Sequence, residues 1–235
     1  KNSSIHVESL QGNILKGLVI NKGTIVTEKD TLLKFSYITL KYDIWGLLNK
    51  EIRLDYLVLN SPNISLTKVK DADSLVWNFT KLFSSSTEPN DTSTSTFDWG
   101  ISVKKFKIEN GTFKTSGDSV PGPVKFTREF DFNNLLAANL ELELTADYFT
   151  DYKNVSMKNF SFNTNSDFKL KHFNFDAGIN IKDTITDVWN FNLVTDISNI
   201  KFDKLKLQSF NPFDSNSFND FYNKNIEADI KIDKF

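Results

Sequence analysis

The sequence has 235 residues, no cysteine and a formal net charge of −2, from 28 basic and 30 acidic residues. A chain of this length can bury a substantial apolar interior, in one large β domain or two modest ones, without disulfides or cysteine-based metal sites. The sequence has no excess or cluster of basic residues of the kind that binds nucleic acid, so we expect no nucleic-acid partner. No run of 18 or more apolar residues occurs, and the chain begins at Lys1 without a leader, so we expect a piece of a longer protein.

Apolar and polar residues alternate along most of the chain, which is the period of a half-buried β-strand. In the first third, Leu33, Phe35 and Tyr37 share one predicted strand face. The segment 51–59 predicts a strand in which Ile52, Leu54, Tyr56 and Val58 share one face. Leu57 and Leu59 make the strand apolar on both faces near its end. Similar strands are predicted around Ile101 and Val103, Leu140, Leu142 and Leu144, Phe160 and Phe162, Phe168 and Leu170, Phe173 and Phe175, and Ile179 and Ile181.

Turn-forming residues separate these runs. Asn, Gly, Ser and Pro cluster at 21–23, 60–63, 110–111, 116–118 and 165–167. Asn110-Gly111 predicts a two-residue hairpin, because both central residues of that turn must tolerate positive φ.

Three segments depart from strand alternation and predict short helices: 43–49, 73–84 and 216–222. A polar loop follows at 84–96, and a second break lies at 120–124. We therefore expect a first β-groove repeat over 1–118, with helices near 43–49 and 73–84, and a second repeat over 124–235 that continues it.

Catalytic and metal-binding patterns are not recognisable in this sequence. His6 and His172 are far apart, and we expect His172 to occupy a solvent-facing or rim position on a strand. Glu141 and Glu143 alternate with leucines, which indicates a solvated strand face rather than an acid–base pair. Gly12 and Gly17 are expected to be turn glycines. We predict no catalytic residues, no metal and no cofactor, and therefore no enzyme.

The four tryptophans, at positions 45, 77, 99 and 189, could form a ligand platform, but we expect them to pack in the core or at the rim where helices join strands. The apolar strand faces need a cover, either from a second sheet in a closed sandwich or from acyl chains in a curled trough. The sequence alone leaves both open. The candidate residues for the floor of such a trough are Leu54, Tyr56, Val58, Leu140, Leu142, Leu144, Phe160 and Phe162.

Five segments follow one pattern: VESLQGNILKGLVINKGTIV (7–26), LLKFSYITLKYDIWGLLNKEIRLDYLVLNSPNISL (32–66), FDWGISVKKFKIENGTFK (97–114), FDFNNLLAANLELEL (130–144) and VSMKNFSFNTNSDFKLKHFNFDAGINIKD (155–183). The pattern has a strand with a glycine-led entry, an aromatic and Leu-Leu turn, and a strand that ends at Ser-Pro. In these segments the chain resembles the AsmA and TamB family of bacterial envelope proteins. Asp167 stands where that family has a glycine.

This resemblance implies an elongated, twisted antiparallel sheet that curls into a U-shaped groove, with two or three short helices. It also implies a periplasmic location and an inner-membrane anchor through an N-terminal helix absent from this segment. The implied function is phospholipid transport and outer-membrane biogenesis, with acyl chains held in the groove. The alternative is an assembly module whose strand edges pair with outer-membrane β-barrel proteins or an Omp85-type partner.

Overall fold

The computed structural model describes residues 3–27, 30–71, 74–80, 99–117, 133–165, 168–180, 185–208 and 226–234. The protein is all-β, as the alternation predicts, with one 3₁₀ helix, η1, among the described residues. The elements are β1 (Ser3–Asn13), β2 (Gly17–Thr27), β3 (Asp30–Asp43), η1 (Ile44–Asn49), β4 (Glu51–Asn60), β5 (Asn63–Asp71), β6 (Ser74–Trp77), β7 (Gly100–Ser116), β8 (Leu136–Tyr148), β9 (Tyr152–Thr164), β10 (Lys169–Asn180), β11 (Ile185–Thr195), β12 (Asn199–Gln208) and β13 (Ile226–Lys234).

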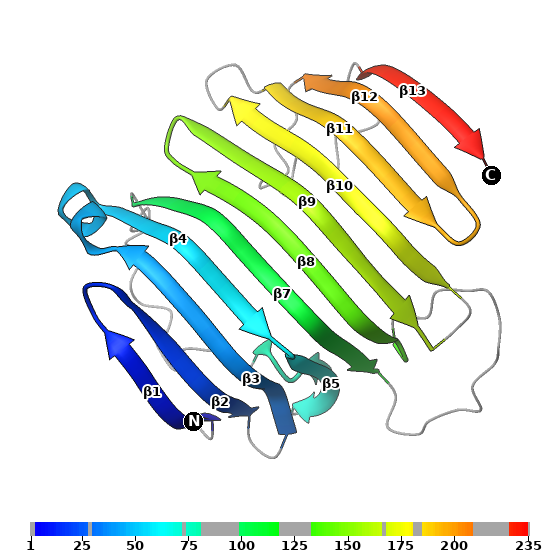
Figure 1. The fold of residues 1–235 in the computed structure, drawn as a ribbon. Helices are drawn as coiled ribbons and strands as arrows, with labels where there is room; N and C mark the ends of the chain where they lie inside the picture. Colours follow the sequence, from blue (N-terminus) through cyan, green and yellow to red (C-terminus); the bar gives the residue numbers. More distant parts are fainter. Residues whose placement is uncertain are drawn as a thin grey trace.

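These strands form one mostly antiparallel sheet in the order β1-β2-β3-β4-β7-β8-β9-β10-β11-β12-β13. Figure 1 shows β1 at one edge and β13 at the other, with strands that bend along their length. Pairing between β7 and β8 joins the two expected repeats in one sheet, and the break predicted between them at 120–124 lies outside the described residues. In the described part of the chain, strands contact their sheet neighbours, so these elements supply no second layer.

The sheet is antiparallel except where β4 and β5 meet β7. β5 continues the line of β4, because Asn60 pairs with Glu109 and Asn63 pairs with Thr112. Ser61 and Asn110 lie at corresponding positions of this parallel pair, and both have left-handed φ values, 48° and 52°. Both strands therefore bend at the same level of the sheet.

The hairpin predicted at Asn110-Gly111 is wrong. β7 runs without a break through these residues, and its pairing with β8 shifts register between Ile108 and Gly111. The predicted turn at 21–23 also lies inside a strand, β2, where Lys22 has a φ of 39°. Residues that tolerate positive φ occur within strands as well as in turns. At Asn110 the register shift marks a β-bulge, whereas β2 keeps its register with β1 and β3 on both sides of Lys22.

The predicted helices have different outcomes. A short helix is present at Ile44–Asn49, close to the expected 43–49. The helix predicted at 73–84 is wrong over Ser74–Trp77, which form β6 and pair with β5 from Lys68 to Asp71. The predicted helix at 216–222 and the polar loop at 84–96 lie outside the described residues.

Candidate functional site

One face of the sheet carries apolar side chains in rows that cross the strands. Residues paired across neighbouring strands point to the same face, so the register defines each row. Two rows cross from β1 to β9 and from β2 to β10, and a third crosses from β3 to β12. The rows are Leu10, Ile20, Ile38, Leu59, Ile108, Leu142 and Phe160; Leu18, Leu40, Leu57, Phe106, Leu144, Met157 and Phe175; and Tyr42, Leu54, Val103, Ala146, Val155, Ala177, Val188 and Leu205. We call this surface the apolar face.

Aromatic rings extend the apolar face into the C-terminal half. Phe160 and Phe162 have ring centroids 5.3 Å apart. Farther along, the ring of Phe191 meets Phe173 edge-on at 5.3 Å and stacks on Phe202 at 4.3 Å. Most of these side chains are half-buried, because neighbours within the sheet cover their flanks while the outer side stays uncovered by the described strands.

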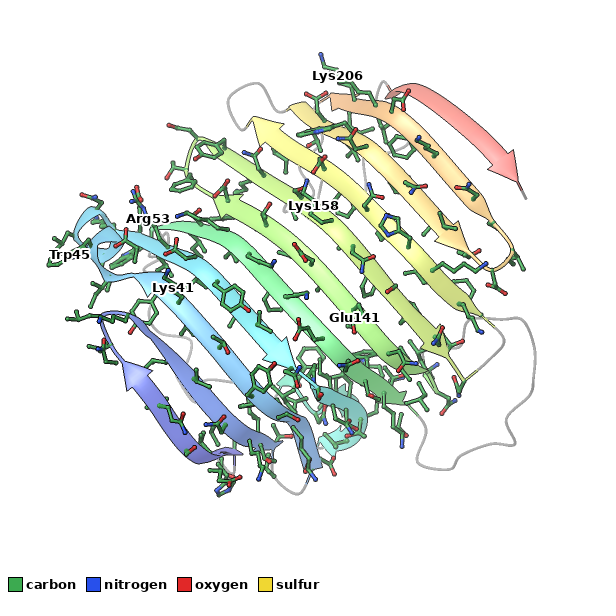
Figure 2. The ribbon with its side chains drawn as sticks, viewed as in Figure 1. Lys41, Trp45, Arg53, Glu141, Lys158 and Lys206 are labelled. Carbon is green, nitrogen blue, oxygen red and sulfur yellow. The ribbon has the colours of Figure 1, made fainter. Side chains whose placement is uncertain are left out.

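The opposite face is polar and is the one seen in Figure 2, where Glu141 and Lys158 stand on β8 and β9. Its charges pair within the face. Lys107 lies 2.6 Å from Glu109, and Lys104 lies 2.6 Å from Asp55. The hydrogen bond from Lys104 lowers the pKa of Asp55 below its usual value. We call this surface the polar face.

Asp176 on β10 is the centre of a hydrogen-bond network on the polar face. Its carboxylate accepts from Ser156, from Asn190 at 2.7 Å and from Lys158 at 3.3 Å. Burial alone raises the pKa of Asp176, but these donors outweigh burial and hold the pKa below its usual value. The network ties three strands, β9 to β11, together on the polar side.

The structure places six of the eight candidate floor residues on the apolar face. Leu54, Leu142, Leu144 and Phe160 belong to the rows. The other two are Leu140 and Phe162. Leu140 lies beside Ile108, since a Cβ at Gly111 would meet both side chains, and the ring of Phe162 contacts that of Phe160.

Tyr56 and Val58 lie on the polar face, so the expected sharing of one face with Leu54 is wrong. Between β3 and β4 the register shifts: Tyr42 pairs with Leu54, but Lys41 pairs with Tyr56. This bulge places Asp55 and Tyr56 together opposite Lys41, and the alternation reverses after it. Val58 pairs with Thr39 and Lys107.

The candidate catalytic groups are held in structural contacts. His172 lies on the polar face, with its ring nitrogens 3.0 Å and 2.7 Å from the side-chain oxygens of Asn159 and Asn174. Glu141 accepts a hydrogen bond from the backbone N–H of Asn110, and Glu143 lies 3.5 Å from Lys105. His6, on β1, contacts Ser4 and is not near His172.

Neither a metal centre nor a membrane-spanning helix is present in the described ranges. No group of three or more His, Cys, Asp or Glu side chains there is placed to hold a metal ion. No helix in that part of the chain has the length and apolarity to cross a bilayer.

Sequence reasoning missed two parts of the apolar face. Phe191 and Phe202 were not among the candidates, although their stacked rings connect β11 to β12. The segments 188–194 and 200–207 do carry apolar residues, but the alternation is interrupted near Asn190, which has a φ of 54°. The change in apolar–polar alternation at Asn190 is the sequence signal that could have identified these two residues.

Comparison with known proteins gives no relative: no family model, no curated protein and no solved structure matches this chain.

Proposed function

We propose that the apolar face curls into a U-shaped groove that holds phospholipid acyl chains. In this role the chain is a segment of a periplasmic bridge-like protein for phospholipid transport and outer-membrane biogenesis. The periplasmic location and the inner-membrane anchor rest on the resemblance to the AsmA and TamB proteins, which stays a prediction.

The single observation that supports this proposal is the continuity of the apolar rows. An acyl chain that moves across the sheet meets an apolar side chain on each successive strand from β2 to β9. The longest row crosses eight strands, from β3 to β12, and at a spacing of about 4.8 Å it gives a path of roughly 34 Å. Burial of each methylene contributes about 0.8 kcal/mol, and a uniform row offers no deep trap that would stop sliding.

Native mass spectrometry with lipid extraction tests this proposal. The chain is expressed in a Gram-negative host and purified without harsh detergent, as wild type, Leu142→Glu and Glu143→Gln. We expect co-purifying phospholipid with wild type and Glu143→Gln, and its loss with Leu142→Glu while circular dichroism stays that of a folded β protein. A folded wild-type chain that carries no lipid contradicts the proposal.

The second candidate function is strand pairing with an outer-membrane β-barrel protein or an Omp85-type partner. It is favoured by β1, whose eleven residues are all exposed and which, among the described strands, pairs with β2 alone. A free strand edge is a template for a partner strand. This alternative predicts binding to unfolded barrel segments that does not require lipid, and a proline at Val7 would weaken it.

A further inference from the structure

Exposed apolar side chains gather at one end of the sheet. Seven of the twelve large hydrophobic residues that are exposed in the described part of the chain lie there, in or beside three turns. The opposite end has Leu136 and Ile197. The seven are Ile14 and Leu15 between β1 and β2, Trp45, Leu47 and Leu48 in η1, and Tyr148 and Tyr152 at the turn between β8 and β9. We call this end the turn end.

The three turns share one end because of the strand directions. β1, β3 and β8 all run toward the turn end, and β2, β4 and β9 run away from it. Two of the turns lie close together through the start of β7. The Gly100 N–H donates to the Lys50 carbonyl at 2.9 Å, and the ring of Phe149 packs against the space that a Cβ on Gly100 would occupy. Phe149 in turn lies 4.9 Å from the ring of Tyr152.

Local hydrogen bonds fix the first two turns. The side chain of Asn13 accepts from the N–H groups of Leu15 and Lys16, which closes the turn after β1. In η1, Asp43 accepts from the Trp45 N–H at 3.0 Å, and Lys50 ends the helix in a left-handed conformation. Gly46 faces the start of β4, where a Cβ would lie 2.9 Å from the Glu51 carbonyl.

These constraints keep η1 against the sheet and direct its apolar residues outward. Trp45 is 71% exposed and Leu48 is 78% exposed. Figure 2 shows Trp45 at the tip, beyond the ends of the strands. The expectation that Trp45 packs in the core or at the rim is therefore wrong.

Basic residues accompany the apolar ones at each turn. Lys16 and Lys50 are exposed next to the first and second turns, and the ammonium of Lys153 lies 4.4 Å from the ring centroid of Tyr148. Of the acidic groups beside η1, Glu51 and Asp43 are engaged by Arg53 at 2.5 Å and 3.6 Å. Asp151 is the acidic residue at the third turn.

We propose that the turn end docks on the surface of a lipid bilayer that contains anionic lipids, with Trp45, Leu48 and Leu15 inserted at headgroup depth. Tryptophan, tyrosine and leucine flanked by lysine are typical of side chains that reside at this interface. The apolar groups stand on three separate turns, so they suit a deformable surface better than a shaped protein pocket. This inference does not depend on acyl chains binding to the apolar face.

Vesicle flotation of the full chain tests the inference. The vesicles contain phosphatidylethanolamine with phosphatidylglycerol, or phosphatidylcholine alone. The variants are Trp45→Asp with Leu48→Asp at the turn end, and Ile197→Asp as a matched control, because Ile197 is 62% exposed at the opposite end. We expect the double variant to bind anionic vesicles at least about tenfold more weakly, with Ile197→Asp unchanged and neutral vesicles bound less well by wild type.

Three results overturn the inference: a wild-type chain that does not float, equal loss in the Ile197→Asp control, or a turn-end variant that binds normally. Size-exclusion chromatography tests the alternative that two copies of the chain associate through the turn end. A wild-type dimer that becomes a monomer in the double variant would contradict bilayer docking. Native mass spectrometry of the double variant separates the two proposals. Retained lipid shows that acyl-chain binding survives when docking is lost.

Discussion

Two adjacent residues of β8 show that side chains on the two faces of the sheet make different kinds of contact. Glu143 lies on the polar face, 3.5 Å from Lys105, among charges that pair with one another across the strands. Leu142 lies on the apolar face between Ile108 and Phe160, with further apolar residues on the strands beyond them. The polar face pairs charges within itself, as Lys107 does with Glu109, and can stand in water. Among the described residues, the apolar face gains contacts only along the sheet, so a further apolar component would stabilise it by removing area from water.

The largest expected effect on the free energy of unfolding is on β4. There, two neighbouring residues allow stability and lipid binding to be changed separately. Val58 lies on the polar face and is 2% exposed, whereas Leu57 lies half-buried on the apolar face. Val58→Ala should lower the free energy of unfolding by about 2 kcal/mol, because it leaves a cavity. Lipid occupancy of the folded fraction should not change.

Leu57→Glu is expected to have the opposite pair of effects. It should remove lipid from the folded protein while costing less stability than Val58→Ala, since its side chain can reach water. Denaturant titration with native mass spectrometry measures both quantities. A lipid loss in Val58→Ala that matches the loss in Leu57→Glu would break the distinction between the faces.

The sequence predicted the class of fold well because period-two alternation is a local property. Strands at Leu140–Leu144, Phe160–Phe162 and Phe173–Phe175 follow directly from it. It predicted which face each residue occupies less well, because a bulge inverts the alternation and depends on the partner strand. Tyr56 and Val58 were misplaced for this reason. Asn110-Gly111 was misread because a left-handed residue fits a hairpin and a bulge equally well until its neighbours are known.

A medium effect is expected at the bulge that bends β7. Asn110 has a φ of 52°, a region that β-branched residues adopt at a cost. Asn110→Val should lower the free energy of unfolding by about 1–2 kcal/mol, and Asn110→Gly by no more than a few tenths. Urea denaturation of the two variants measures the difference. Equal stability of Val and Gly variants would show that the bend does not require this conformation.

The smallest effect concerns the polar face at acid pH. Hydrogen bonds hold the pKa of Asp176 below its usual value of 3.8, so the folded state favours the carboxylate. That contribution is complete above the pKa of the unfolded chain and is lost as the pH falls through the lower folded pKa. Asp176→Asn should therefore be less stable than wild type at pH 7, with the difference shrinking below about pH 4. Thermal unfolding between pH 3 and about pH 7 checks this, and a constant difference would contradict it.

Photocrosslinking from two adjacent positions tests the central claim most directly. A benzophenone amino acid replaces Leu144 on the apolar face or Glu143 on the polar face, and the chain is irradiated in Gram-negative cells before purification. We expect a phospholipid adduct from position 144 and none from position 143. Equal adducts from both positions, or none from position 144 in a folded chain, would contradict it.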